Sequence, residues 1–127
     1  MKKALALIAY TRLAYLQMVW ASICAQTIAG RPLSESYDIY IFQDGPWAED
    51  SYDIRIEHVE VRKWMDELPS GVTLHTQSAN LGIALHYDFI EKLLFVDRGY
   101  DFVVFCEDDL VLAPGYMSVI DLSLIHI

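Results

Sequence analysis

Four short runs of strand-forming residues, separated by longer segments with helical periodicity, constrain the fold of this chain most strongly. The runs lie at residues 4–10, 37–42, 72–75 and 102–106. The run 102–106 is continuously apolar, as expected for a parallel strand buried on both faces. Strands separated by helical crossovers imply a parallel α/β sheet with right-handed connections. We therefore predict a doubly wound, mainly parallel sheet with its strands in the order 3-2-1-4 and helices on its faces.

Helix signals occupy the segments between the runs. Residues 13–26 carry one apolar face for packing on the sheet, formed by Leu13, Leu16, Val19, Trp20, Ile23 and Cys24. Residues 51–68 are predicted to be mostly helix. The next helix is expected to begin with a cap at Asn80 and to end near Arg98, before Gly99. Its predicted inner side consists of Leu81, Leu85, Phe89, Leu93 and Leu94.

The composition fits one globular domain. The chain has 127 residues, is 54% hydrophobic and has a formal net charge of −9. That charge argues against nucleic acid and anionic membranes as partners, since both need a basic surface. No stretch approaches the roughly 20 apolar residues of a membrane-spanning helix, so we predict no transmembrane segment.

The amino terminus allows two interpretations. Met1-Lys2-Lys3 followed by an apolar stretch resembles the start of a signal peptide, but Arg12 interrupts that stretch. We favour a strand followed by a helix. Cys24 and Cys106 form neither a disulfide framework nor a zinc site, so we expect two reduced cysteines that pack in the core and a cytoplasmic location.

Three acidic residues, Glu107-Asp108-Asp109, follow directly on the strand 102–106. Ligands of open α/β sheets bind just outside the carboxyl ends of such strands. Clustered carboxylates repel one another unless a cation shares them. Mn²⁺ or Mg²⁺ takes one or two carboxylates and completes its coordination with water and phosphate oxygens. The pattern therefore indicates a metal site that receives a nucleotide diphosphate, and the alternative is a solvated acidic loop.

Several motifs together resemble the GT-A glycosyltransferases, and within them the N-acetylglucosaminyltransferase I family. The second strand ends in Gln43-Asp44, a helix carries Ile83-Ala84-Leu85-His86-Tyr87, and Glu107-Asp108-Asp109-Leu110 is followed by Ala113-Pro114 and Tyr116. The likeness covers residues 4–121. It implies that this part of the chain is the Rossmann-like, nucleotide-binding half of a glycosyltransferase domain.

The resemblance also implies roles for individual residues. Arg12 would lie near the uracil, Asp44 would hold the base, and His86 would contact the nucleotide. Asp108 would bond the ribose. Asp109 would ligate Mn²⁺ (or Mg²⁺).

Glu107 would support the metal site by ordering its loop. The donor would then be a UDP-sugar, with UDP-GlcNAc as one candidate, and the acceptor would be an unidentified hydroxyl on a glycan or another molecule.

Taken singly, these residues have simpler interpretations. His86 could be a packed histidine of an amphipathic helix, Asp44 a turn residue, and Arg12 a solvent-exposed residue of the first helical turn.

The carboxyl terminus indicates that the chain is the first part of a longer enzyme. Read as codons, residues 122–127 correspond to a sequencing-library adapter, so we predict that they are an artefact and exclude them from fold reasoning. The family's catalytic base would lie beyond Ile127, so no catalytic residue is named. We therefore expect the chain alone not to transfer sugar.

Three other functions remain. A sugar-phosphate nucleotidyltransferase would need a glycine-rich, basic loop after the first strand, and residues 9–12 contain no glycine. A receiver-like signalling module, which binds Mg²⁺ without being an enzyme of this kind, would need acids after the first strand. The third possibility is a remnant without catalytic activity.

Overall fold

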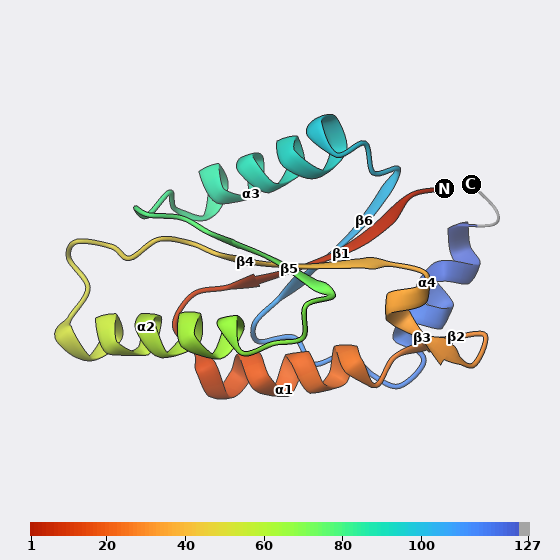
Figure 1. The fold of residues 1–127 in the computed structure, drawn as a ribbon, viewed down its shortest axis with the longest axis horizontal. Helices are drawn as coiled ribbons and strands as arrows, with labels where there is room; N and C mark the ends of the chain where they lie inside the picture. Colours follow the sequence, from red (N-terminus) through yellow and green to blue (C-terminus); the bar gives the residue numbers. More distant parts are fainter. Residues whose placement is uncertain (125–127) are drawn as a thin grey trace.

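The computed structural model describes residues 1–124, and in that part of the chain four parallel strands form the central sheet (Figure 1). Their order is β5-β4-β1-β6, which confirms the predicted order 3-2-1-4. The strands span β1 (Lys3–Ala9), β4 (Asp38–Gln43), β5 (Val72–Thr76) and β6 (Phe102–Glu107). The chain moves outward from β1 to β5 and then returns to the other side of β1, which makes the β1–β6 pair the point where the strand order reverses.

The strand register aligns the carboxyl ends of three strands. Ala9 of β1 lies opposite Gln43 of β4, and Ile8 lies opposite Glu107 of β6. β1 occupies the centre because it is apolar on both faces, and its residues 4–7 are fully buried. The loops that follow β1, β4 and β6 consequently emerge at the same edge of the sheet.

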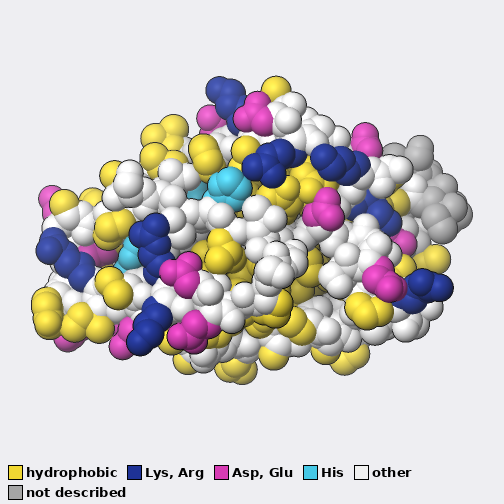
Figure 2. Space-filling view, viewed as in Figure 1, with side chains coloured by type: hydrophobic (Ala, Val, Ile, Leu, Met, Phe, Trp, Pro, Cys, Tyr) yellow, Lys and Arg dark blue, Asp and Glu magenta, His cyan; other side chains and the backbone are white. Residues whose placement is uncertain are grey.

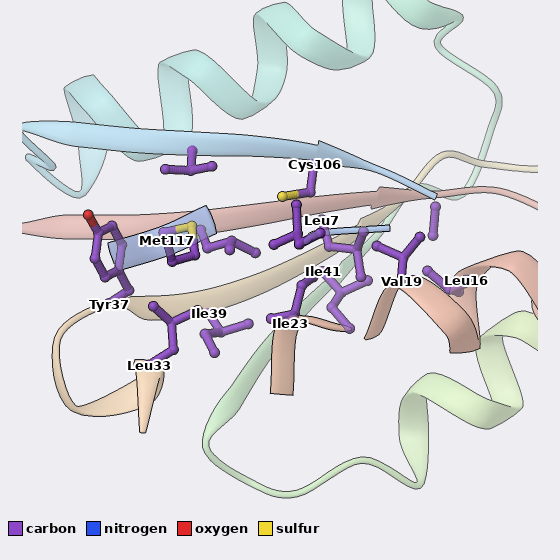
Figure 3. Close-up of a cluster of buried hydrophobic side chains, with 14 of the residues drawn as sticks. Leu7, Leu16, Val19, Ile23, Leu33, Tyr37, Ile39, Ile41, Cys106 and Met117 are labelled. Carbon is purple, nitrogen blue, oxygen red and sulfur yellow. The ribbon is translucent and has the colours of Figure 1, made fainter. Parts of the chain in front are cut away.

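Helices cover both faces of the sheet (Figure 1). One face carries α1 (Leu13–Cys24), α2 (Tyr52–Asp66) and α4 (Tyr116–Leu124). The other face carries α3 (Ile83–Glu91), which continues as a π-helical segment at Lys92–Asp97. The larger core lies on the first face (Figure 3), where Leu7 and Ile41 of the sheet pack against side chains of α1 and Met117 of α4.

The predicted start of α3 is wrong, and its predicted inner face is confirmed only in part. The helix begins after Gly82, not at Asn80, whose side-chain Nδ2 instead donates to the Gly45 carbonyl at 3.0 Å. The fully covered side chains are His86, Ile90 and Leu94, whereas Leu85 is 62% exposed. Leu94, Phe89 and Leu93 of the predicted face do pack against the core. Apolar residues such as Ile83 and Leu85 also lie on the exposed side, so periodicity alone did not select the face that packs on the sheet.

The first helix ends two residues earlier than predicted. Its last residue is Cys24, and the following Gln26 is buried and bonds to the segment around α4. Gln26 Nε2 donates to Ala113 O at 3.0 Å, and Gln26 Oε1 accepts from Met117 N at 2.9 Å. These bonds to a distant segment compete with continuation of the helix.

A short hairpin that the sequence analysis did not anticipate follows α1. It pairs β2 (Thr27–Ile28) with β3 (Arg31–Pro32), and a 3₁₀ turn, η1 (Leu33–Glu35), comes next. The prediction for the cysteines is confirmed only for Cys106, because Cys106 is buried while Cys24 is exposed, and neither forms a disulfide.

Charged side chains are interspersed on the face seen in Figure 2, where Lys and Arg lie beside Asp and Glu. Among the described residues, no helix is both long and apolar enough to cross a membrane. α4 extends through Leu124, so it includes the first half of the segment predicted to be an adapter artefact. Residues 125–127, and the catalytic base expected after them, lie outside the described residues.

Candidate functional site

A cleft of about 430 Å³ opens at the carboxyl ends of β1, β4 and β6. Its walls come from residues 8–12 at the end of β1 and just after it, Asp44 after β4, the start of α3, and Glu107 with Asp108 at the end of β6. This is the edge where the strand order reverses, which is where open α/β sheets bind ligands. The cleft therefore brings together Arg12, Asp44, His86, Glu107 and Asp108, and Asp109 follows directly on them.

Arg12 and the acidic loop face each other across the β1–β6 pair. Arg12 Nη2 donates to Asp108 Oδ1 at 2.6 Å and lies 3.7 Å from Asp109 Oδ2. The hydrogen bond to Asp108 and the charge of that carboxylate raise the pKa of Arg12. Asp108 is buried, whereas the Asp109 side chain is 43% exposed. Asp109 thus presents the more accessible carboxylate of the pair.

Asp44 is bound by backbone donors on the other side of the cleft. Its Oδ1 accepts from Gly45 N at 2.8 Å and from Leu81 N at 2.9 Å, and its Oδ2 accepts from Gly82 N at 3.1 Å. The side chain is buried. Asp44 lines the cleft and also ties the end of β4 to the loop that leads into α3.

His86 enters the cleft from the first turn of α3. Its Nε2 is buried and has no hydrogen-bond partner among the described residues. Burial lowers the pKa of His86, and the nearby charge of Asp44 opposes that shift. A buried ring nitrogen without a partner costs free energy unless something bonds to it. The His86 side chain lines the cleft, while its unpartnered Nε2 is itself covered by protein atoms.

Tyr87 is a cleft residue to which the sequence analysis assigned no role. Its hydroxyl donates to Glu107 Oε1 at 3.1 Å, and its ring lies 5.6 Å from that of Phe105. Burial, followed by the bond to Glu107, raises the pKa of Tyr87 to about 12. In the sequence, the one feature that could have pointed to Tyr87 was its position next to His86. Tyr87 restrains the first carboxylate of the acidic loop.

Tyr10 also lines the cleft and was not singled out from the sequence. Its hydroxyl donates to the Asp50 carboxylate and accepts from Trp47 N at 3.1 Å. Burial and the bond to Asp50 raise the pKa of Tyr10 to about 12. Tyr10 thereby holds the loop after β4 next to the cleft.

Two other histidines, His58 and His75, do not line the cleft. His58 is buried, and its Nε2 bonds to Asp44 O at 2.8 Å, which gives it a structural role in the loop after β4. His75 has a buried Nε2 without a partner, as His86 does, but it does not line the cleft. His75 is therefore a natural comparison for His86.

The acidic loop has the donor types that a hard divalent cation prefers. Among the described residues, no group of three or more His, Cys, Asp or Glu side chains is placed to hold a metal ion by itself. Asp109 has a long contact with Arg12, and Glu107 is an exposed residue whose Oε1 accepts from Tyr87. A cation that takes one or two carboxylates, and otherwise phosphate oxygens and water, fits this set.

The similarity of this chain to known proteins lies in its three-dimensional structure. No protein-family model and no curated protein sequence matches the chain. A crystal structure of S. aureus TarS 1-349 matches 98% of this chain at a TM-score of 0.57 and 16% identity. A second structure of S. aureus TarS matches 86% of the chain at a TM-score of 0.53 and 16% identity. TarS is a glycosyltransferase.

This similarity establishes that the chain shares the fold of the matched part of TarS. The matched region covers 32% of the first TarS chain and 17% of the second. The chain therefore spans about a third of the length of the shorter structure that it matches.

Proposed function

We propose that this chain is the nucleotide-binding part of a metal-dependent glycosyltransferase that uses a nucleotide-diphospho-sugar, with UDP-GlcNAc as the first candidate donor. The observation that carries the proposal is the composition of the cleft at the β1–β6 switch point. An arginine, an acidic loop and a buried histidine nitrogen without a partner meet there. The GT-A resemblance of the motifs and the TarS-like fold support the same function.

The two halves of the cleft suit the two halves of such a ligand. His86 and the loop around Asp44 form a wall with a buried, unpartnered ring nitrogen, and we expect a small shift of this side chain to let the nitrogen bond to a nucleobase. Arg12 and the loop Glu107–Asp109 form the charged side, which suits a ribose and a diphosphate. We assign the ribose to Asp108, as the resemblance implies.

Asp109, with Glu107 in support, is the proposed ligand for Mn²⁺ or Mg²⁺. Such an ion, when bound, neutralises the diphosphate and stabilises it as a leaving group. Arg12 already lies within reach of both aspartates and would add a positive charge on the same side. The acidic loop would in this way receive an anionic ligand.

Calorimetric titration with UDP tests the proposal. We expect tighter binding with Mn²⁺ than with a chelator, because the ion links the carboxylates to the diphosphate. Asp109→Ala should remove the enhancement by Mn²⁺. The matched control is Asp97→Ala, which removes an exposed carboxylate at the far end of the α3 layer and should leave the enhancement intact.

Equal UDP affinity with and without Mn²⁺ in the unmodified chain would contradict the proposed metal site. Equal affinities for UDP and for inorganic diphosphate, which lacks the base and the ribose, would contradict the proposed base-binding wall.

A further inference from the structure

We infer that Asp44 is a positioning residue, which fixes the loop 77–82 and the first turn of α3 so that His86 and Tyr87 face the ligand. This inference rests on the proposed function for the identity of the ligand. It departs from the role implied by the GT-A resemblance, in which this aspartate itself holds the base. The difference matters because the two roles predict different responses to a change of base.

The carboxylate of Asp44 is already occupied by the protein. It accepts three backbone N–H groups, from Gly45, Leu81 and Gly82, at 2.8, 2.9 and 3.1 Å. A carboxylate offers about four lone-pair sites, and Asp44 as a whole is only 8% exposed. The main chain of Asp44 is occupied as well, because its carbonyl bonds to His58 Nε2. Little of the residue is left to contact a base.

Other contacts join the same two segments. Gln77 N donates to Gln43 O at 3.0 Å, and Asn80 Nδ2 donates to Gly45 O at 3.0 Å. A Cβ on Gly45 would overlap the backbone of Ala79, so only glycine permits this close approach. The end of β4 and the loop 77–82 therefore behave as one joined unit, with Asp44 at its centre.

The joined loop determines how α3 begins. Gly82 precedes the helix with φ of +80°, and its carbonyl accepts from His86 N at 2.9 Å. The first turn contains no acidic residue, and the residue that precedes the helix supplies no side-chain cap. Asp44 brings a negative charge to this end of α3 from another strand, which the helix dipole favours. Any change that frees Gly82 also frees the turn that carries His86.

Discrimination between UDP and CDP separates the two roles. Uracil carries an N3–H donor where cytosine has an acceptor, so a carboxylate in direct contact with N3 of the base would favour uracil. If Asp44 reads the base, Asp44→Asn and Asp44→Ala should change the ratio of the two affinities. If Asp44 positions the loop, both affinities should fall by the same factor, about tenfold for loss of a hydrogen bond to a charged group.

The experiment combines calorimetry with amide hydrogen exchange. The unmodified chain, Asp44→Asn, Asp44→Ala and Asp66→Asn are titrated with UDP and with CDP in the presence of Mn²⁺. Exchange is measured without nucleotide over residues 77–90, where opening of the loop exposes the amides of Leu81 and Gly82. Asp66→Asn is the matched control, since Asp66 is an exposed residue at the end of α2, outside the cleft, and should change neither readout.

We expect faster exchange at residues 77–90 in both Asp44 variants and an unchanged ratio of UDP to CDP affinity. A changed ratio with normal exchange would overturn the inference and favour direct base contact. If the unmodified chain bound neither nucleotide, the proposed function would fail, while the exchange measurement would still decide whether Asp44 holds the loop. Asp44→Asn preserves the size of the side chain, so it provides the test if Asp44→Ala does not fold.

Discussion

At the amino end of the sheet, polar side chains bond to one another, whereas toward the carboxyl end three buried polar atoms have no hydrogen-bond partner among the described residues, and one of them belongs to the cleft residue His86. The amino end joins Tyr40 Oη and Tyr100 Oη at 2.9 Å, and Tyr100 Oη donates to Asp38 Oδ2 at 2.6 Å. Arg98 Nη1 also donates to Tyr40 Oη at 3.3 Å. These groups satisfy one another.

The buried polar groups without a hydrogen-bond partner lie in the carboxyl halves of two strands and at the start of α3. Among the described residues, the buried side-chain atoms without a hydrogen-bond partner are Gln43 Oε1, His75 Nε2 and His86 Nε2. Gln43 ends β4, His75 lies near the end of β5, and His86 enters the cleft. A closed polar network stabilises the fold, while an unpartnered polar side chain that lines a cleft, as His86 does, marks a position where a ligand can complete the hydrogen bonding.

The largest expected effect comes from forcing apart the segments that build the cleft. Gly45→Ala should lower the free energy of unfolding by about 1–3 kcal/mol, because the added Cβ overlaps the backbone of Ala79. Urea unfolding measures the change. Gly71→Ala is the control, since a Cβ there meets nothing within 4 Å. Equal stability of the two variants would show that the loop 77–82 yields without cost.

Removing one hydroxyl at each end tests the comparison directly. Tyr100→Phe should cost about 1–2 kcal/mol of stability, because it leaves part of a buried network unpaired, and it should leave UDP affinity unchanged. Tyr87→Phe should cost less stability, since its partner Glu107 is exposed, but should weaken Mn²⁺-dependent UDP binding. Unfolding curves give the stability of both variants, and calorimetry gives their affinity for UDP. A loss of UDP affinity in Tyr100→Phe but not in Tyr87→Phe would contradict this comparison of the two ends.

The two histidines with an unpartnered Nε2 sharpen the comparison within the carboxyl half. His86→Gln should weaken UDP binding by about threefold to tenfold, the range for one net hydrogen bond. His75→Gln should leave UDP affinity unchanged, because His75 does not line the cleft. Calorimetry at fixed Mn²⁺ concentration checks this. Equal losses in both variants would mean that His86 acts only through packing.

The smallest expected effect is a dependence of stability on pH. Burial lowers the pKa of both His75 and His86 below the ordinary value, with Arg98 also contributing at His75. As the pH falls below about 6.5, the unfolded chain takes up protons that the folded chain resists, so stability should decrease. Unfolding at pH 7 and pH 5 measures the decrease, which should be smaller in His75→Gln and His86→Gln. An unchanged decrease in both variants would assign it to other groups.

The sequence by itself determined the order of the strands and the edge where the site would form. The apolar run 102–106 and the helical segments between the strands specified a parallel sheet, and the structure confirms its order. That order placed Arg12 opposite Asp108, as the 2.6 Å ion pair shows. Strand and helix periodicity are local properties, so they can be recognised without the folded chain. The binding roles of these residues stay predictions.

Only the tertiary structure decided the details that shape the cleft. α3 begins after Gly82 because Asp44 binds the backbone of the preceding loop across more than thirty positions of sequence. Its buried face follows His86 and Ile90, and α1 stops at Cys24 while Gln26 turns to Ala113 and Met117. These outcomes depend on hydrogen bonds and packing between distant segments, which compete with local propensity and leave no periodic signal in the sequence.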